Sequence, residues 1–191
     1  MSGNNLYEEV IIAGFGGQGI ILAGKLLAQA GMKASLEVTY MPSYGAEMRG
    51  GTANSMITIS NKPVASPLVT NPNSAIVMNK ASVEKFAARV KKNGLIVYNS
   101  SLINAAPAVD SSIKLLAMPA DDLAVELGNI KIANMVILGA YLQTKNIISC
   151  DTAAESLSAV LAKRYHKTIP LNTAALQKGA EFAKKAEAEN L

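Results

Sequence analysis

The sequence predicts an α/β domain in which a mostly parallel sheet packs against helices. The first observation is a strand, a glycine loop and a helix in succession over residues 9–31. The second is a charged helical segment, 80–92, flanked by short apolar runs at 75–78 and 95–98. Because parallel strands need a long crossover, usually a helix, this alternation of strand and helix is typical of a parallel sheet.

The N-terminal elements follow from residue type and period. Residues 9–13 form a short β-branched run that predicts a buried strand, and residues 20–31 have the apolar spacing of a helix. Residues 34–40 and 52–60 are further strand candidates. The segment 41–51 between them is rich in glycine and proline, so we expect a loop there.

Helices are expected to dominate the C-terminal part of the chain. Their signals are acidic residues in a first turn, a capping pair and apolar faces at helical spacing. The expected helices are one that starts at Pro119 with Asp121 and Asp122 in its first turn, one over 132–143 that is apolar nearly all round, one over 157–164 after the capping pair Thr152 and Glu155, and one over 171–188 with a single apolar face.

Length and composition favour a single domain over residues 1–191. The chain of 191 residues has the size of one domain and shows no internal repeat, low-complexity linker or break in composition. Hydrophobic residues make up 50% and charged residues only 17%, so disorder is excluded and a large core is expected. The apolar excess also favours a buried interface, or self-association of the isolated chain as a homodimer.

The charge pattern argues against nucleic acid and membranes as partners. The formal net charge is +4, but the densest basic stretch, 80–92, contains a single aromatic residue, Phe86. We interpret it as a solvated helix face, because nucleic-acid sites combine cations with aromatic side chains. The first ten residues do not resemble a secretory signal, and no stretch has the length and apolarity of a membrane span. We therefore expect a cytoplasmic protein.

Few residues are suited to catalysis or metal binding. Cys150 is the single cysteine and His166 the single histidine, and they lie far apart in the sequence. One cysteine excludes an internal disulfide and a thiolate set for zinc or an iron–sulfur cluster. No histidine pair or His/Asp pair has metal-ligand spacing. We expect no catalytic residue and no metal ligand on this chain.

The first glycine loop has the G-x-G-x-x-G spacing at Gly14, Gly16 and Gly19, between an expected strand and an expected helix. Backbone N–H groups and the helix N-terminus in such a loop can face an anion. An NAD or FAD site would also want an acidic residue at the end of the second strand, where the sequence has 39–42 and places Glu37 in mid-strand. The alternative is a tight turn that only packs against another backbone.

A second loop, within residues 41–54, places opposite charges among glycines. Flexible backbone holds such charges poorly unless they meet a partner or each other. An equally weighted alternative is a surface hairpin whose exposed ion pair contributes little. The candidate site residues in this loop are Tyr44, Glu47, Arg49, Gly50 and Gly51.

A third candidate element precedes the apolar helix. Gly128 is suited to end one helix, and Asn134 to begin the next. We expect Asn134 to cap the helix or to bridge backbone groups. Only a position beside the first glycine loop would make it a ligand contact.

Three motifs occur in one order along the chain. They are Gly14-Phe-Gly-Gly-Gln-Gly19, Tyr44-Gly-Ala-Glu-Met-Arg-Gly-Gly51, and the stretch from Pro119 through Glu126-Leu-Gly-Asn129 to Asn134-Met-Val-Ile-Leu-Gly139. Together, over residues 8–142, they resemble the gamma subunit of 2-oxoacid:ferredoxin (acceptor) oxidoreductases. The second loop is more similar to 2-oxoglutarate and branched-chain members of that family than to pyruvate members.

The resemblance implies a Rossmann-like three-layer α/β sandwich, with helices on both faces of a mostly parallel sheet. It implies a multi-subunit enzyme that decarboxylates a 2-oxoacid on thiamine diphosphate, passes electrons through iron–sulfur clusters to ferredoxin and delivers the acyl group to coenzyme A. This chain lacks the G-D-G motif of the thiamine-binding subunit, and one cysteine cannot ligate a four-cysteine cluster. We expect those cofactors in the assembled complex and none on this chain alone.

The resemblance also implies roles and partners. The gamma domain is expected to help shape the site where coenzyme A reaches the buried intermediate, with loop N–H groups as donors, Arg49 as a bidentate cation and Glu47 orienting it. The implied partners are alpha and beta subunits, with a ferredoxin-like delta subunit as a further candidate, and ferredoxin as acceptor; the isolated chain is expected to be inactive. 2-Oxoglutarate is the favoured substrate, with branched-chain 2-oxoacids and pyruvate as alternatives. The candidate binding residues are Gly14, Gly16, Gly17, Gln18, Gly19, Tyr44, Glu47, Arg49, Gly50, Gly51 and Asn134.

Two other classes of function stay open. A free-standing nucleotide-binding module would use the 14–19 loop to bind NAD, FAD or another nucleotide. A structural or interaction protein would use both loops for packing alone, so that Arg49→Ala would weaken assembly and leave the turnover of the complex unchanged.

Overall fold

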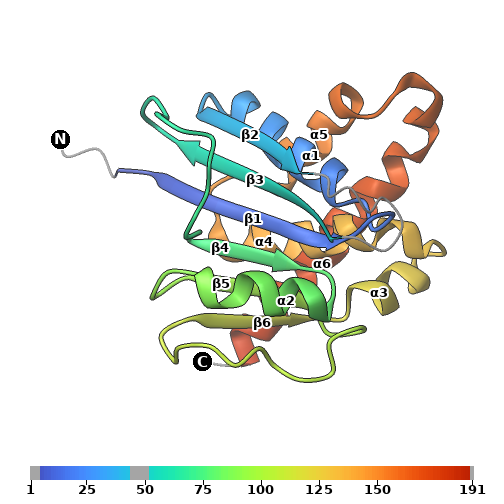
Figure 1. Ribbon diagram of the computed structural model, residues 1–191. Coiled ribbons are helices and arrows are strands. Elements are labelled where there is room, and N and C mark those ends of the chain that lie inside the picture. Colours follow the sequence, from blue (N-terminus) through green and yellow to red (C-terminus); the bar gives the residue numbers. More distant parts are fainter. Residues whose placement is uncertain (1–4, 44–51, 190–191) are drawn as a thin grey trace.

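The computed structural model describes residues 5–43 and 52–189, and its centre is a single six-stranded sheet (Figure 1). The strand order is β2-β3-β1-β4-β5-β6. The strands are β1 (Tyr7–Phe15), β2 (Glu37–Ser43), β3 (Thr52–Ser60), β4 (Ser74–Val77), β5 (Leu95–Asn99) and β6 (Lys114–Met118).

The sheet is mostly parallel, as predicted, with one exception. β1, β4, β5 and β6 pair in parallel, whereas β3 is antiparallel to both of its neighbours, β1 and β2. Only the segment 44–51 separates β2 from β3 in the sequence. Such a short connection suits antiparallel strands, because parallel neighbours need a dozen or more residues to return.

Helices cover the two faces of the sheet unequally (Figure 1). Most of them pack in the large core cluster on one face, and α2 lies on the other face, in front of β5 in this view. Short 3₁₀ turns follow α2 and precede α4 and α6. The helices are α1 (Ile20–Lys33), α2 (Lys80–Phe86), α3 (Ala120–Glu126), α4 (Ala133–Lys145), α5 (Cys150–Val160) and α6 (Ile169–Glu189).

Strand β1 divides the core. Val10 and Ile12 pack into the large cluster under the helices, and Ile11 and Ala13 pack on the opposite face with Val69. Successive side chains of a strand point to opposite faces, so a strand buried on both sides is a continuous apolar run. This arrangement explains the apolar segment on which the first strand prediction rested.

Helix α4 is buried on all sides, as its even apolar pattern predicted. It lies between the sheet and α6, and the two helices cross at glycines. A Cβ on Gly139 would collide with the carbonyl of Leu176, and one on Gly179 with the carbonyl of Val136. Glycine is therefore required at both positions for the backbones to approach this closely.

Several predicted boundaries were wrong. The expected helix over 157–164 is α5, which begins at Cys150; its N-cap is Ser149, whose side chain accepts a hydrogen bond from the Thr152 N–H. Thr152 and Glu155 therefore lie inside the helix, and Glu155 pairs with Lys33 of α1 at 2.8 Å. Strand β2 begins three residues later than predicted, at Glu37 rather than Ala34.

The expected helix over 80–92 was also too long. α2 ends at Phe86, and a 3₁₀ turn, Ala87–Arg89, follows it. The final helix instead extends further than predicted, over Ile169–Glu189. The predicted helix start at Pro119 is confirmed, because Pro119 is the N-cap of α3.

Candidate functional site

The first glycine loop joins β1 to α1 at the carboxyl end of the parallel strands. Gly17 and Gly19 have φ angles of +97° and +72°, in the left-handed region that favours glycine. Gly19 is the N-cap of α1, and no side chain of the described residues caps that helix end. The predicted strand, loop and helix are therefore confirmed, and the first turn of α1 presents backbone N–H groups beside the loop.

The side chain of Gln18 folds back over the loop. Its Oε1 accepts hydrogen bonds from the Phe15 N–H at 2.7 Å and from Asn79 Nδ2 at 3.1 Å, and its Nε2 donates to the Met78 carbonyl at 3.4 Å. The Gln18 N–H donates to the Phe15 carbonyl at 3.2 Å. Gln18 is therefore occupied in holding the loop, and its backbone N–H, expected to face an anion, closes the turn instead.

Asn79 holds the other end of this contact. It follows β4, is 4% exposed, and its Oδ1 accepts a hydrogen bond from the Ser82 N–H at 2.9 Å as the N-cap of α2. Sequence reasoning missed Asn79, although an asparagine just before a helical segment is a capping signal. That signal identifies the cap but not the link to Gln18, which joins two parts of the chain.

Asn134 contacts the loop from α4. It is 3% exposed, and its Nδ2 donates to the Gly19 carbonyl at 3.0 Å. Asn134 lies in the first turn of α4, whose N-cap is Ile132. It therefore bridges backbone groups rather than capping the helix, and it does lie beside the first glycine loop. A Cβ on Gly19 would collide with the Asn134 amide, so only glycine fits there.

A small cavity opens beside the loop. Its volume is about 180 Å³, and it is lined by Gly17, Gln18, Met78, Asp121, Lys131 and Asn134, among others. Asp121 accepts a hydrogen bond from Asn99 Nδ2 at 2.8 Å, while Lys131 is exposed. Two large apolar side chains of this edge, Phe15 and Ile130, are exposed. A cavity that is mostly apolar and carries a few polar groups is typical of a surface that meets a ligand or another chain.

The second predicted loop lies largely outside the described residues. The part outside contains the candidate site residues Tyr44, Glu47, Arg49, Gly50 and Gly51. Thr52, which follows them, pairs with Phe15 at the end of β1. The chain therefore enters β3 at the same edge of the sheet as the first glycine loop.

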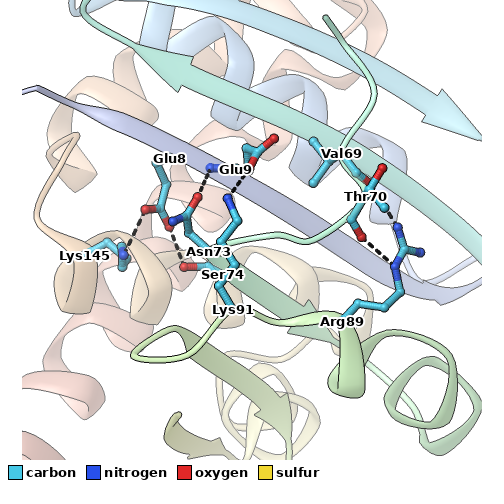
Figure 2. A network of polar contacts seen from close by, with 9 residues as sticks. All are labelled: Glu8, Glu9, Val69, Thr70, Asn73, Ser74, Arg89, Lys91 and Lys145. Carbon is cyan, nitrogen blue, oxygen red and sulfur yellow. Dashed lines mark hydrogen bonds and ion pairs between the residues drawn. The ribbon is translucent and has the colours of Figure 1, made fainter. Parts of the chain in front are cut away.

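The amino end of the parallel strands carries charged contacts (Figure 2). Glu8 is buried; it pairs with Lys145 at 2.9 Å and accepts a hydrogen bond from the Ser74 hydroxyl. Glu9 pairs with Lys91, and its N–H donates to Asn73 at 3.0 Å. These groups satisfy one another and hold β1 to β4, α4 and the segment that follows Arg89.

The basic stretch 80–92 is only partly the solvated face that we expected. Arg89 donates to the carbonyls of Val69 and Thr70 at 3.0 and 2.8 Å (Figure 2). Lys91 pairs with Glu9. The stretch therefore holds the segment between β3 and β4 through Arg89, and strand β1 through Lys91.

Cys150 and His166 are not arranged as a nucleophile and base. Burial, and to a lesser extent Asp151, raises the pKa of the Cys150 thiol to about 11, so the thiol is protonated at neutral pH. His166 contacts the Leu161 carbonyl through Nε2 at 3.0 Å. Within the described residues, no group of three or more His, Cys, Asp or Glu side chains is placed to hold a metal ion. No helix in this part of the chain has the length and apolarity of a membrane span.

The fold and the site define a class: an α/β domain with a glycine loop at the carboxyl end of its parallel strands and, among the described residues, no group of side chains placed to hold a metal ion. The family model described as pyruvate ferredoxin/flavodoxin oxidoreductase matches residues 9–182. The chain belongs to this family.

Two curated relatives cover nearly the whole chain. The ketoisovalerate oxidoreductase subunit VorA of Methanothermobacter thermautotrophicus is 33% identical over 92% of this chain. This chain spans only 36% of that relative's length. The 2-oxoglutarate synthase subunit KorC of Methanocaldococcus jannaschii is 31% identical, with 93% of this chain and 94% of the relative covered.

Two solved structures share the fold. The gamma subunit of a keto/oxoacid ferredoxin oxidoreductase from Geobacter sulfurreducens has a TM-score of 0.79 and 26% identity, with 93% of this chain and 99% of that chain covered. The 2-oxoglutarate:ferredoxin oxidoreductase from Magnetococcus marinus, with 2-oxoglutarate, coenzyme A and succinyl-CoA bound, has a TM-score of 0.85 and 27% identity. It covers 96% of this chain, which spans 32% of that chain. The resemblance to a gamma subunit is confirmed.

Proposed function

We propose that this chain is the gamma subunit of an enzyme that oxidatively decarboxylates a 2-oxoacid to an acyl-CoA and passes the electrons to ferredoxin. The observation that carries the proposal is agreement over 99% of a solved gamma subunit, against a third of a larger oxidoreductase chain. The remaining chemistry then resides on alpha and beta subunits, with a ferredoxin-like delta subunit as a further candidate. Thiamine diphosphate and the iron–sulfur clusters belong to those chains, since Cys150 alone cannot ligate a cluster.

The carboxyl edge of the sheet is the proposed site of contact with coenzyme A and with the neighbouring subunit. Gly16, Gly17 and Gly19 supply close backbone approach, and the uncapped start of α1 supplies partial positive charge. Ser43 and Thr52, which bound the second loop, lie at this same end of the strands, and in the proposal Arg49 binds phosphate and Glu47 orients it. In this scheme Gln18 and Asn134 shape the loop from within, and the isolated chain is inactive.

The substrate we favour is 2-oxoglutarate. KorC, a 2-oxoglutarate synthase subunit, matches this chain over nearly the whole length of both. A branched-chain 2-oxoacid is the next candidate, because VorA, a ketoisovalerate oxidoreductase subunit, is 33% identical to this chain, close to the identity of KorC. Pyruvate is third. The thiamine pocket that selects among them belongs to other subunits, so this chain alone does not decide the substrate.

A free-standing nucleotide-binding module is the alternative function. In its favour are the observed strand, glycine loop and helix. Against it, antiparallel β3 lies between β1 and β2, whereas a dinucleotide site uses adjacent parallel strands with an acidic residue at the end of the second. Here β2 ends at Ser43, and Glu37 is its first residue. Calorimetry with NAD, FAD and ATP on the purified chain tests this alternative. The absence of binding heat with all three nucleotides would eliminate it.

The decisive experiment is an anaerobic pull-down of the tagged chain from its native cells. The eluate is assayed for coenzyme A-dependent viologen reduction with 2-oxoglutarate, 3-methyl-2-oxobutanoate and pyruvate. Our proposal predicts co-purifying subunits and turnover with one 2-oxoacid above the others. A chain that elutes alone as a monomer or homodimer and is inactive would contradict it, as would activity of the chain by itself.

A further inference from the structure

Asn79 joins two helix starts. Through Oδ1 it caps α2, accepting from the Ser82 N–H at 2.9 Å, and through Nδ2 it donates to Gln18 Oε1 at 3.1 Å. It is 4% exposed and stands at the end of β4, directly after Met78, whose carbonyl receives the Gln18 amide. One buried side chain therefore connects α2 to the loop that begins α1.

We propose that Asn79 is a positioning residue for the glycine loop, acting through Gln18 to hold the loop backbone in the geometry that receives coenzyme A. This inference rests on the proposed function and adds to it a residue that lies in neither glycine loop. Asn79 does not line the cavity beside the loop, whereas Gln18 does. Its effect on a ligand is therefore transmitted by Gln18.

The hydrogen bonds permit only one orientation of the two amides. The Ser82 N–H requires an acceptor, which places Oδ1 of Asn79 toward α2 and Nδ2 toward Gln18. The Phe15 N–H likewise requires an acceptor, so Oε1 of Gln18 faces it and Nε2 faces the Met78 carbonyl. Each of these contacts then joins a donor to an acceptor, and reversing either amide would place like groups together.

The loop has little room to adopt another shape at its base. A Cβ built on Gly14 would lie 2.7 Å from Gln18 Oε1 and 2.6 Å from the Ile20 side chain. The Gln18 side chain therefore sits directly over the start of the loop. If the donor from Asn79 is lost, Gln18 keeps only the Phe15 N–H on Oε1 and the 3.4 Å contact of Nε2 with the Met78 carbonyl, so its side chain is held less firmly in this position.

The two contacts of Asn79 can be separated by substitution. Asn79→Asp keeps an oxygen to cap α2, because Asp and Asn are about equally good N-caps. It removes the donor to Gln18 and sets a second acceptor against Oε1. Asn79→Ser also keeps a capping oxygen but carries neither charge nor a donor that reaches Gln18. Ser149→Asp, at the N-cap of α5, is the matched control for changing a cap and adding a charge.

The test uses the assembled complex under anaerobic conditions, with KM for coenzyme A, KM for the 2-oxoacid and kcat measured separately. Both Asn79 variants are expected to raise KM for coenzyme A by roughly threefold to tenfold, the effect of one lost hydrogen bond. KM for the 2-oxoacid and subunit stoichiometry should stay as in the wild type, while Tm should fall in both Asn79 variants, and further in Asn79→Asp because it buries a carboxylate. Ser149→Asp should change none of these values.

Three results would overturn the inference. An unchanged KM for coenzyme A in active Asn79 variants would show that the loop does not need Asn79, while the proposed function would stand. Failure of both variants to assemble, with Ser149→Asp intact, would assign Asn79 to folding alone. A wild-type complex without coenzyme A-dependent turnover would refute the proposed function itself, and that result is read before any variant is made.

Discussion

The two ends of the sheet are held in different ways. At the amino end, carboxylates meet lysines, as where buried Glu8 pairs with Lys145 (Figure 2). At the carboxyl end, neutral amides of Gln18, Asn79 and Asn134 hold a glycine loop without any charge of their own. The charged end looks at first like the site, yet its groups satisfy one another. The neutral end leaves a helix start uncapped and a cavity open.

This difference shows that a buried charge marks a site only when it lacks a partner. Burying a carboxylate is costly unless cations and hydroxyls surround it, and Glu8 has both. Amides can fix a loop at lower desolvation cost and leave the local field to the helix dipole. Substitutions at the amino end of the strands should therefore change stability, and substitutions at the carboxyl end should change function.

The largest expected effect on stability belongs to Glu8→Ala. Removing a buried ion-pair partner and an acceptor of the Ser74 hydroxyl should lower the free energy of unfolding by about 3 kcal/mol. Urea denaturation of the purified chain measures this loss. Lys92→Ala is the matched control, since Lys92 is largely exposed and lies 3.9 Å from Asp110. If Glu8→Ala costs no more than the control, the amino end is not the fastening that we describe.

The largest expected effect on function belongs to Gly19→Ala. Both Gly19 and Gly17 have positive φ, so alanine at either should cost about 1 to 2 kcal/mol of backbone strain. Only at Gly19 would the new Cβ also strike the Asn134 amide, whereas nothing lies within 4 Å of a Cβ on Gly17. Gly19→Ala should therefore reduce coenzyme A-dependent turnover of the complex far more than Gly17→Ala. Equal losses in the two variants would show that Asn134 does not determine the loop.

A smaller effect is expected for Asn134→Ala. It removes the donor to the Gly19 carbonyl, worth about 1 kcal/mol of stability, and leaves that carbonyl with its helical bond from the Ala23 N–H. Thermal unfolding measures the stability loss. The same variant should raise KM for coenzyme A, and an increase in KM for the 2-oxoacid alone would move the site away from this loop.

The smallest expected effect belongs to Lys91→Met. Its pair with Glu9 is partly exposed, so the loss should stay below about 1 kcal/mol and shrink further as salt is added. Denaturation at two salt concentrations checks this dependence. Kinetic constants of the complex should not change, and a change would link the two ends of the sheet.

Sequence patterns predicted the elements whose physical signal lies within a short stretch of the chain. The glycine spacing at 14–19 predicted the turn into α1, and the apolar run at 132–143 predicted that α4 is buried. β6 was missed because Lys114–Met118 contains no β-branched residue; it becomes a strand by pairing with β5. The antiparallel pairing of β3 with β1 was likewise not visible, since it joins segments that are distant in the sequence.

The candidate site shows the same division. Gly19 and Asn134 were both identified in advance, but the bond between them joins residues that are 115 positions apart. Asn79 carries a capping signal and nothing that indicates Gln18. The roles of Tyr44, Glu47 and Arg49 stay predictions, because these residues lie outside the described ranges.

Our central proposal is that this chain contacts coenzyme A and the neighbouring subunit at the carboxyl end of its parallel strands. Hydrogen exchange followed by mass spectrometry on the isolated chain, the assembled complex and the complex with coenzyme A tests it most directly. We predict that assembly and then coenzyme A slow exchange in peptides covering 16–22 and 129–134, while peptides covering the amino-edge segment 61–73 stay as they are. Protection confined to 61–73, or none at the glycine loop, would contradict the account.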